Sequence, residues 1–185
     1  DNCIVNLAAD IKKVVSIPVI AVNKIKDVHA AEQILQEGKA DLVAMGRPLI
    51  ADPDLASKAR AGRFEAIRPC IYCCQGCAQN ILEKDAPLAC STNPTAGREI
   101  EGALEQAPTK KKVLILGAGP AGVQAAVTAA SRGHYVRLVE SRNEVGGQLT
   151  LAAKPPGKSE IGRFLTYLKN CLKAQGIQVE LGVKI

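Results

Sequence analysis

The sequence predicts an α/β fold in which two parallel-sheet units are separated by a cysteine-rich segment. Short apolar runs alternate with segments of helical period over residues 4–66, and the same alternation returns from residue 112 onwards. These runs are too apolar to have a solvent-facing side, which is typical of parallel strands covered by helices. Residues 67–97 break the rhythm and hold five of the seven cysteines.

The first unit is predicted to span residues 1–66. Apolar residues recur at helical spacing over residues 4–15, and the run SIPVIAV at residues 16–22 then predicts a buried strand. A second helix is expected after its cap, Asp27, with Gly38 as the left-handed residue that stops it.

A second buried strand is predicted at residues 40–45, ADLVAM. Residues 46–48 are expected to form a turn out of this strand. A third helix should begin at Asp52 and Pro53 and end at Gly62.

The second unit is predicted to span residues 111–185, after a linker at residues 98–110 that has no strong period. We expect a strand from Lys112, a helix to about Arg132 stopped by Gly133, a strand YVRLVE, a helix capped by Ser159 and ended by Gly176, and a closing strand over residues 177–183.

The composition disfavours several classes of function. The net charge of +6 comes from scattered lysines and arginines, and only five aromatic residues are present to stack on bases, which argues against nucleic-acid binding. No window approaches the ~18 uninterrupted apolar residues of a membrane span. Cysteines clustered this unevenly indicate metal ligands in a reducing compartment, so we expect a soluble, cytoplasmic protein without a nucleic-acid or membrane partner.

The cysteine spacing predicts an iron–sulfur cluster. Cys70, Cys73 and Cys77 lie within eight residues, and Cys90 follows after twelve intervening positions. Three thiolates on a tight loop, with a fourth from farther along the chain, form the usual ligand set of a [4Fe–4S] cluster. A zinc site is the alternative, but zinc ribbons generally present two separated CxxC pairs, and the second pair is missing. The spacing leaves Cys74 open as a further ligand.

The motif GAGPAG at residues 117–122 lies between a predicted strand and a helix, and Glu140 ends the next strand. Glycines permit a close approach of the backbone to a pyrophosphate, the helix N-terminus can bind that group, and a carboxylate can accept from ribose hydroxyls. We predict a site for NAD, FAD or a bare ADP moiety, with a plain glycine-rich turn as the alternative. Gly146, Gly147 and Gln148 form a second segment that could reach the same ligand.

Two turns of the first unit carry residues suited to a phosphate. Asn23 and Lys24 follow the first predicted strand, and Gly46 and Arg47 follow the second. If these strands are the last two of a (β/α)₈ barrel, their loops form its usual phosphate site. An ordinary turn glycine and a surface arginine explain the pattern equally well.

Four other residues are expected to be structural. His29 and His134 have no carboxylate or nucleophile within sequence reach, which favours surface roles. Cys3 and Cys171 are expected to pack against apolar neighbours.

Seven segments follow one another in a distinctive order: SIPVIAVNKI, ADLVAMGRPLIADPDL, RPCIYCCQGC, CSTNPTAGRE, KKVLILGAGPAG, EVGGQL and PPGKSEIGRFLTYLK. This order resembles the iron–sulfur flavoenzymes of the NADH:flavin oxidoreductase family, which include 2,4-dienoyl-CoA reductase, 2-enoate reductase and trimethylamine dehydrogenase. The resemblance implies the last two strands of an FMN-binding TIM barrel, a [4Fe–4S] loop, and the first part of a Rossmann-like domain that binds FAD or ADP.

The resemblance also implies roles for particular residues. The FMN phosphate region would contain Asn23, Lys24, Gly46 and Arg47. The adenine-dinucleotide site would contain Gly117, Gly119, Ala121, Gly122, Glu140, Gly147 and Gln148. The cluster ligands would be Cys70, Cys73, Cys77 and Cys90. The family's usual loop reads CIxCNQxC, so Cys74 stands where an asparagine is common, and Tyr72 occupies a position that is generally small.

In reductases of this family, electrons pass from NAD(P)H to FAD, to the cluster, to FMN and then to an activated alkene. The resemblance thus implies a small-molecule substrate such as an enoyl-CoA, an enoate or an enone. The spacing CxxCxxxC is more usual in these reductases, whereas the amine dehydrogenases often use CxxCxxC. An amine dehydrogenase and a non-catalytic electron-transfer module are the alternatives. We interpret the chain as a fragment, with the catalytic residues and the NAD(P)H-binding insert outside it.

Overall fold

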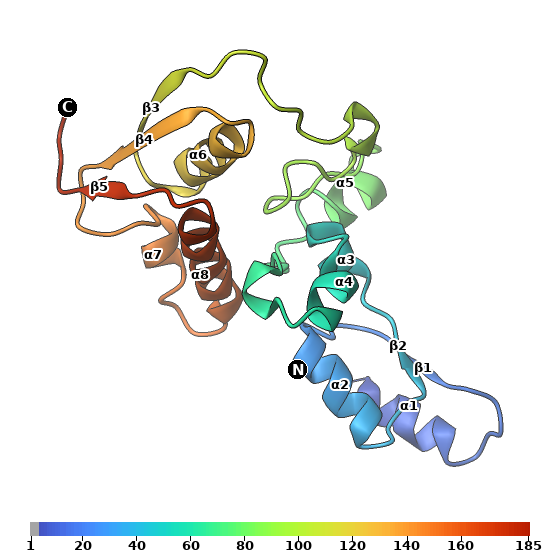
Figure 1. Ribbon diagram of the computed structural model, residues 1–185. Coiled ribbons are helices and arrows are strands. Elements are labelled where there is room, and N and C mark those ends of the chain that lie inside the picture. Colours follow the sequence, from blue (N-terminus) through green and yellow to red (C-terminus); the bar gives the residue numbers. More distant parts are fainter. Residues whose placement is uncertain (1–3) are drawn as a thin grey trace.

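The computed structural model describes residues 4–185, which form two lobes with the cysteine-rich segment between them (Figure 1). Cys3 lies outside the described residues. In the first lobe, two helix–strand pairs succeed one another: α1 (Val5–Lys12), β1 (Ile20–Ala21), α2 (Val28–Gln36) and β2 (Leu42–Val43). The two strands pair in parallel, as predicted, with Ile20 opposite Leu42.

Local signals in the first lobe act as expected. The Asp27 side chain accepts a hydrogen bond from the backbone N–H of Ala30 at 2.9 Å, so it caps α2. Gly38 has a φ of 66° and follows the end of the same helix. Side chains from α1, β1, α2 and the segments next to them form the core of this lobe: Val5, Ala8, Ala21, Ile25, Ala31, Ile34 and Ala40.

The prediction of a simple turn at residues 46–48 is wrong, because α3 (Gly46–Ala51) begins there, directly after β2. Pro48 is accommodated in its first turn, where backbone N–H groups have no partner within the helix. The predicted third helix is α4 (Leu55–Arg60), followed by Gly62 at a φ of 69° and by the short 3₁₀ helix η1 (Phe64–Ala66).

The cysteine-rich segment is mostly irregular and contains one short helix, α5 (Ala78–Leu82). The backbone N–H of Ala89 donates to the carbonyl of Gly76 at 2.7 Å, which brings the chain before Cys90 against the loop that holds the other cysteines. A Cβ atom at Gly76 would lie 2.7 Å from the Ala89 carbonyl oxygen. A glycine is therefore required for this approach. The linker carries the 3₁₀ helix η2 (Glu99–Glu101).

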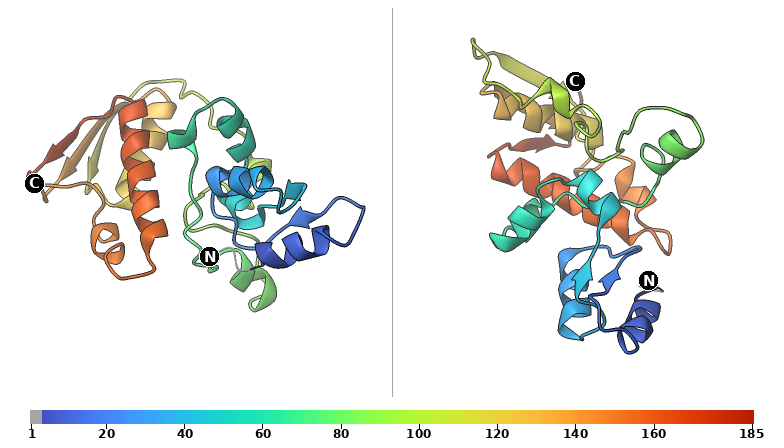
Figure 2. Two further views of the ribbon diagram at one scale, coloured as in Figure 1. Left: turned by 90° about the horizontal axis from the view of Figure 1, so that it is seen from below. Right: turned by 90° about the vertical axis from the view of Figure 1, so that its right-hand side faces the viewer.

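The second lobe contains a parallel sheet with the strand order β3 (Lys112–Leu116), β4 (Tyr135–Glu140) and β5 (Val179–Leu181). The helices α6 (Pro120–Ser131) and α8 (Ser159–Ala174) lie on one side of it, with the short α7 (Leu149–Ala152) beside α8 (Figure 2). Their shared core consists of Ala118, Val123, Ala126, Leu138, Phe164, Tyr167, Leu168 and Leu172. Cys171 packs against this core, as predicted.

One detail of the second lobe differs from expectation. Ser159 is the first residue of α8 and not its cap, because the N-cap position belongs to Lys158 and the Ser159 hydroxyl contacts Glu160 Oε2 at 3.3 Å. His134 is half-buried, and its Nδ1 accepts from the N–H of Lys111 at 3.2 Å. Within the described part of the chain, no helix has the length and hydrophobicity that crossing a membrane requires.

Candidate functional site

Five cysteines line one small pocket: Cys70, Cys73, Cys74, Cys77 and Cys90. Over residues 4–185, no three Cys, His, Asp or Glu side chains are placed to hold a single metal ion. Cysteine thiolates are the usual ligands of iron–sulfur clusters. The donor set thus fits an iron–sulfur cluster, and the choice of its four ligands stays a prediction.

Hydroxyl and amide groups surround the sulfur atoms. Cys73 Sγ lies 3.2 Å from the hydroxyl of Ser91, and Cys90 Sγ lies 3.4 Å from that of Thr92. The N–H of Tyr72 donates to Cys70 Sγ at 3.4 Å. Burial raises the pKa of the Cys70 thiol to about 11, an effect that the neighbouring Cys90 increases. Hydrogen bonds to cluster sulfurs stabilise negative charge and so help to set the reduction potential.

Cys74 differs from the other four cysteines in its partner. Nη1 of Arg47 donates to Cys74 Sγ at 3.2 Å, and Cys74 has a left-handed φ of 58°. Its sulfur is therefore bound by a guanidinium of α3. That Cys74 is the cysteine left out of the ligand set stays a prediction.

The predicted phosphate residues come together at the carboxyl ends of β1 and β2. Lys24 and Arg47 line one cavity of about 470 Å³, and Lys26 adds a third cation. Asn23 precedes Lys24 in the turn after β1 and has a φ of 88°, whereas Gly46 is the first residue of α3. A cationic donor set around a cavity of this size fits the phosphate end of a flavin mononucleotide.

The phosphate-facing cavity and the cysteine cavity have a common wall. Arg47, Ile71 and Cys73 line both of them. The larger cavity is closed on another side by the start of α8, which contributes Ser159, Glu160 and Ile161. One layer of side chains therefore separates the two cavities.

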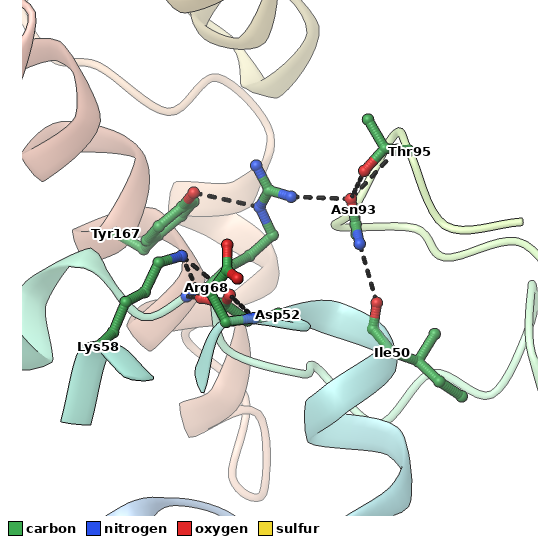
Figure 3. Close-up of polar contacts among 8 residues, drawn as sticks. Ile50, Asp52, Lys58, Arg68, Asn93, Thr95 and Tyr167 are labelled. Carbon is green, nitrogen blue, oxygen red and sulfur yellow. Dashed lines mark hydrogen bonds and ion pairs between the residues drawn. The ribbon is translucent and has the colours of Figure 1, made fainter. Parts of the chain in front are cut away.

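Arg68 connects three parts of the chain (Figure 3). Its backbone N–H donates to Asp52 Oδ2 at 2.7 Å, its Nη1 donates to Asn93 Oδ1 at 2.9 Å, and its Nε donates to the hydroxyl of Tyr167 at 3.1 Å. Asp52 and Asn93 are each 2% exposed. Asp52 also accepts from Lys58 Nζ at 2.7 Å, which compensates its buried charge.

The two lobes are also joined by ion pairs. Lys26 Nζ lies 2.7 Å from Glu160 Oε1, and Arg163 Nη1 lies 3.1 Å from Asp27 Oδ2. The hydrogen bond from Lys26 lowers the pKa of Glu160. These contacts hold α8 against the turn that follows β1.

The glycine-rich turn between β3 and α6 gathers the predicted dinucleotide residues. A Cβ atom on Gly122 would overlap the carbonyl oxygen of Gly117, so the tight turn requires glycine at residue 122. The N–H of Gly146 donates to the carbonyl of Ala118 at 2.9 Å, and a Cβ atom on Gly147 would lie 3.1 Å from the Cα of Gly119. The segment that begins at Gly146 thus lies against the turn, and its predicted contact with the same ligand stays a prediction.

The other members of the predicted set occupy positions around this turn. Glu140 is buried at the end of β4, and its carboxylate accepts from the N–H of Ala118 at 2.7 Å. Ala121 is exposed in the first turn of α6, and Gln148 is exposed at the N-cap of α7. The α6 N-terminus and its open glycine turn fit a pyrophosphate, and direct contacts with a dinucleotide stay a prediction.

Sequence reasoning missed Arg68, Asn93 and Tyr167 as joining residues. The available signal was their position, because Arg68 precedes the first cysteine of the loop by two residues and Asn93 follows the last by three. The partner of Arg68 on α8 has no local signal, since it lies 99 residues away.

Two family models match the chain. Residues 5–65 match the NADH:flavin oxidoreductase / NADH oxidase family, and residues 112–170 match the FAD dependent oxidoreductases. The NADH oxidase of Thermoanaerobacter brockii is 49% identical over 97% of this chain and 28% of its own length. The cinnamate reductase of Clostridium sporogenes is 36% identical over 94% of this chain and 26% of its own length.

Solved structures agree with these relatives. The structure of a 2-naphthoyl-CoA reductase complex has a TM-score of 0.93 and 35% identity, over 98% of this chain and 28% of that one. An amine-oxidising relative, N,N-dimethylglycine/sarcosine dehydrogenase of Chromohalobacter salexigens, is 38% identical over 97% of this chain and 26% of its own length. The chain thus spans about a quarter of each protein that it resembles. It contains the junction of the two matched domains, and it belongs to the NADH:flavin oxidoreductase family.

Proposed function

We propose that the complete protein is an NAD(P)H-dependent flavin and iron–sulfur oxidoreductase that reduces activated C=C bonds, of the 2,4-dienoyl-CoA or 2-enoate type. Relatives whose names denote reduction of cinnamate and of 2-naphthoyl-CoA support this reading. The substrate would be a small molecule such as an enoyl-CoA, an enoate or an enone.

The proposal divides the chain into four segments. Residues 1–66 would be the end of the FMN barrel, residues 67–97 the cluster loop, residues 98–110 the linker, and residues 111–185 the first part of the FAD domain. The matched ranges, 5–65 and 112–170, fall inside the first and the last of these.

The observation that carries the proposal is the common wall of the two cavities. Arg47, Ile71 and Cys73 line both, so groups bound in the two cavities would be close enough for electron exchange. Lys24 and Arg47 would bind the FMN phosphate, four of the five cavity cysteines would hold the cluster, and the α6 N-terminus would bind the FAD pyrophosphate. When bound, these groups supply the electron transfer from NAD(P)H through FAD, cluster and FMN, while the chain holds them in order.

An amine dehydrogenase is the second candidate, because N,N-dimethylglycine/sarcosine dehydrogenase also matches nearly the whole chain. The two candidates differ in the direction of electron flow. A reductase takes electrons from NAD(P)H and passes them to an alkene, whereas an amine dehydrogenase takes them from an amine.

The test is an anaerobic assay of the complete protein with its cofactors. We expect NADH or NADPH to bleach the flavin absorption and a panel of enoates, enoyl-CoA thioesters and enones to restore it. Dimethylglycine and related amines should leave the oxidised flavin unchanged. If neither NADH nor NADPH reduces the flavin, the reductase proposal is refuted. If an amine bleaches the flavin absorption, the protein is an amine dehydrogenase.

A further inference from the structure

Tyr72 has an unusual backbone conformation for an aromatic residue. It lies between Cys70 and Cys73 and has a φ of 54°, in the left-handed region. A bulky side chain is an outlier in this region, so the surrounding contacts must hold it there. Those contacts reach the turn after β1 and the start of α3, the two segments of the predicted phosphate region.

The first contact joins the cysteine loop to the turn after β1. The hydroxyl of Tyr72 donates to the carbonyl of Ile25 at 3.2 Å, and the Ile25 side chain is fully buried in the first lobe. Ile25 directly follows Asn23 and Lys24, which both have positive φ values. The tyrosine hydroxyl therefore anchors the cysteine loop to the end of a strained turn that presents Lys24 to the large cavity.

The second contact joins the same ring to Arg47. The guanidinium carbon of Arg47 lies 4.7 Å from the centre of the Tyr72 ring, which is within the range of a cation–π interaction. One of the five N–H donors of the guanidinium is directed to Cys74 Sγ at 3.2 Å. Arg47 is thus held between two residues of the cysteine loop, although it belongs to α3.

We propose that Tyr72 is a positioning residue for the arginine that binds the FMN phosphate. The ring fixes the plane of the Arg47 guanidinium, and the hydroxyl fixes the ring on the turn that carries Lys24. The ligand chemistry is that of a phosphate monoester dianion on a flavin. This inference rests on the proposed function for the identity of the ligand, and it makes FMN affinity depend on a residue of the cysteine loop.

The test measures flavin binding in the complete protein after removal of FMN, by quenching of flavin fluorescence. We expect Tyr72→Leu to weaken FMN about tenfold, which corresponds to about 1.4 kcal/mol. Tyr72→Phe keeps the ring and loses only the hydrogen bond to Ile25, so its loss should be about threefold. Riboflavin, which has no phosphate, should bind the wild type and Tyr72→Leu equally.

A double-mutant cycle separates positioning from general damage. In an Arg47→Met background, Tyr72→Leu should not change FMN binding further, because the guanidinium that Tyr72 positions is absent. Tyr135→Leu is the matched control, since Tyr135 is 64% exposed on β4 in the second lobe, and it should keep wild-type affinity. Iron content and FAD binding report whether each variant is folded.

Three outcomes would overturn the inference: unchanged FMN affinity in Tyr72→Leu, an equal loss of riboflavin affinity, or the same loss in the Arg47→Met background. If Tyr72→Leu loses its iron, Tyr72→Phe decides the matter, and wild-type FMN affinity in that variant contradicts the proposal. A wild-type protein that binds no FMN would instead refute the proposed function.

Discussion

The backbone N–H of Ala118 donates to Oε2 of Glu140 across 2.7 Å, so the carboxylate that ends β4 holds the glycine-rich turn that follows β3. Its Oε1 accepts from the N–H of Arg142 at 2.8 Å. The hydrogen bonds from Arg142 and Ala118 lower the pKa of Glu140. This carboxylate therefore organises the predicted dinucleotide site.

Glu140→Gln should destabilise the second lobe by about 1–3 kcal/mol, because an amide cannot replace both carboxylate acceptors and leaves a buried N–H group unsatisfied. The measurement is urea unfolding of the complete protein, followed by FAD fluorescence. Glu180→Gln is the matched control, since Glu180 forms an exposed pair with Arg137 and its loss should change stability much less. Equal effects of the two substitutions would contradict the structural role of Glu140.

The contribution of Glu140 should depend on pH. Its pKa in the folded protein is lowered from the ordinary value of 4.5, so its stabilising effect is complete above that value and is lost as the pH falls through the folded-state pKa. The difference in unfolding free energy between wild type and Glu140→Gln should therefore shrink on acidification below pH 4.5. A difference that stays constant down to pH 3 would show that the charge of Glu140 is unimportant.

Gly122→Ala should abolish FAD binding or weaken it at least tenfold. The added Cβ would overlap the carbonyl oxygen of Gly117, so the turn must move away from the start of α6. Gly162→Ala is the control within α8, where the new methyl group would lie 3.9 Å from the nearest atom, the Cβ of Ala153. This second change should keep FAD affinity and raise stability by about 0.5–1 kcal/mol, the gain expected for alanine over glycine in a helix. Unchanged FAD binding in Gly122→Ala would show that the glycine-rich turn is not part of the FAD site.

Features set by neighbouring residues could be predicted from the sequence. The Asp27 cap and the glycine stops at residues 38, 133 and 176 depend on contacts within one or two helical turns, and the structure confirms each of them. The α3 helix was not predicted from the sequence, because glycine at residue 46 and proline at residue 48 are typical of a turn. Only the contacts that the segment makes in the folded protein distinguish the two.

Some predicted site residues lie close together because the fold class itself places them there. Lys24 and Arg47 follow adjacent parallel strands, so they necessarily face the same edge of the sheet. The contacts between Tyr72 and Arg47 and between Arg68 and Tyr167 could not be predicted, because each depends on how the irregular cysteine loop is placed against other elements. Such placement has no periodic signal.

Cys74→Ala should leave the cluster intact, whereas Cys77→Ala should lose it. The sulfur of Cys74 is bound by Nη1 of Arg47, and its position in the loop is the one that the family commonly fills with asparagine. Iron content and visible absorption of the two purified variants decide the matter. Cys171→Ala, in the apolar core of the second lobe, controls for the loss of any thiol and should keep full iron content. Loss of iron in Cys74→Ala would show that Cys74 is a ligand.

Arg68→Met should uncouple the two lobes. The substitution keeps the backbone hydrogen bond to Asp52 but removes the donors to Asn93 and Tyr167, of which Asn93 is almost fully buried. We expect a loss of about 2 kcal/mol or more, because hydrogen bonds from a charged group contribute about 1.5–3 kcal/mol each. Tyr167→Phe removes one of these bonds and should have a smaller effect.

Two probes of urea unfolding in the complete protein test this coupling: FAD fluorescence for the second lobe and visible cluster absorption for the cysteine loop. In the wild type the two transitions should coincide, since Arg68, Lys26 and Arg163 all bridge the lobes. In Arg68→Met the transitions should separate, because the side-chain bonds that join the cysteine-rich segment to α8 and to Asn93 are lost. Arg98→Met removes an exposed pair with Glu101 within the linker and should leave them coincident. Coincident transitions with an unchanged midpoint in Arg68→Met would mean that the lobes are held together without the Arg68 side chain.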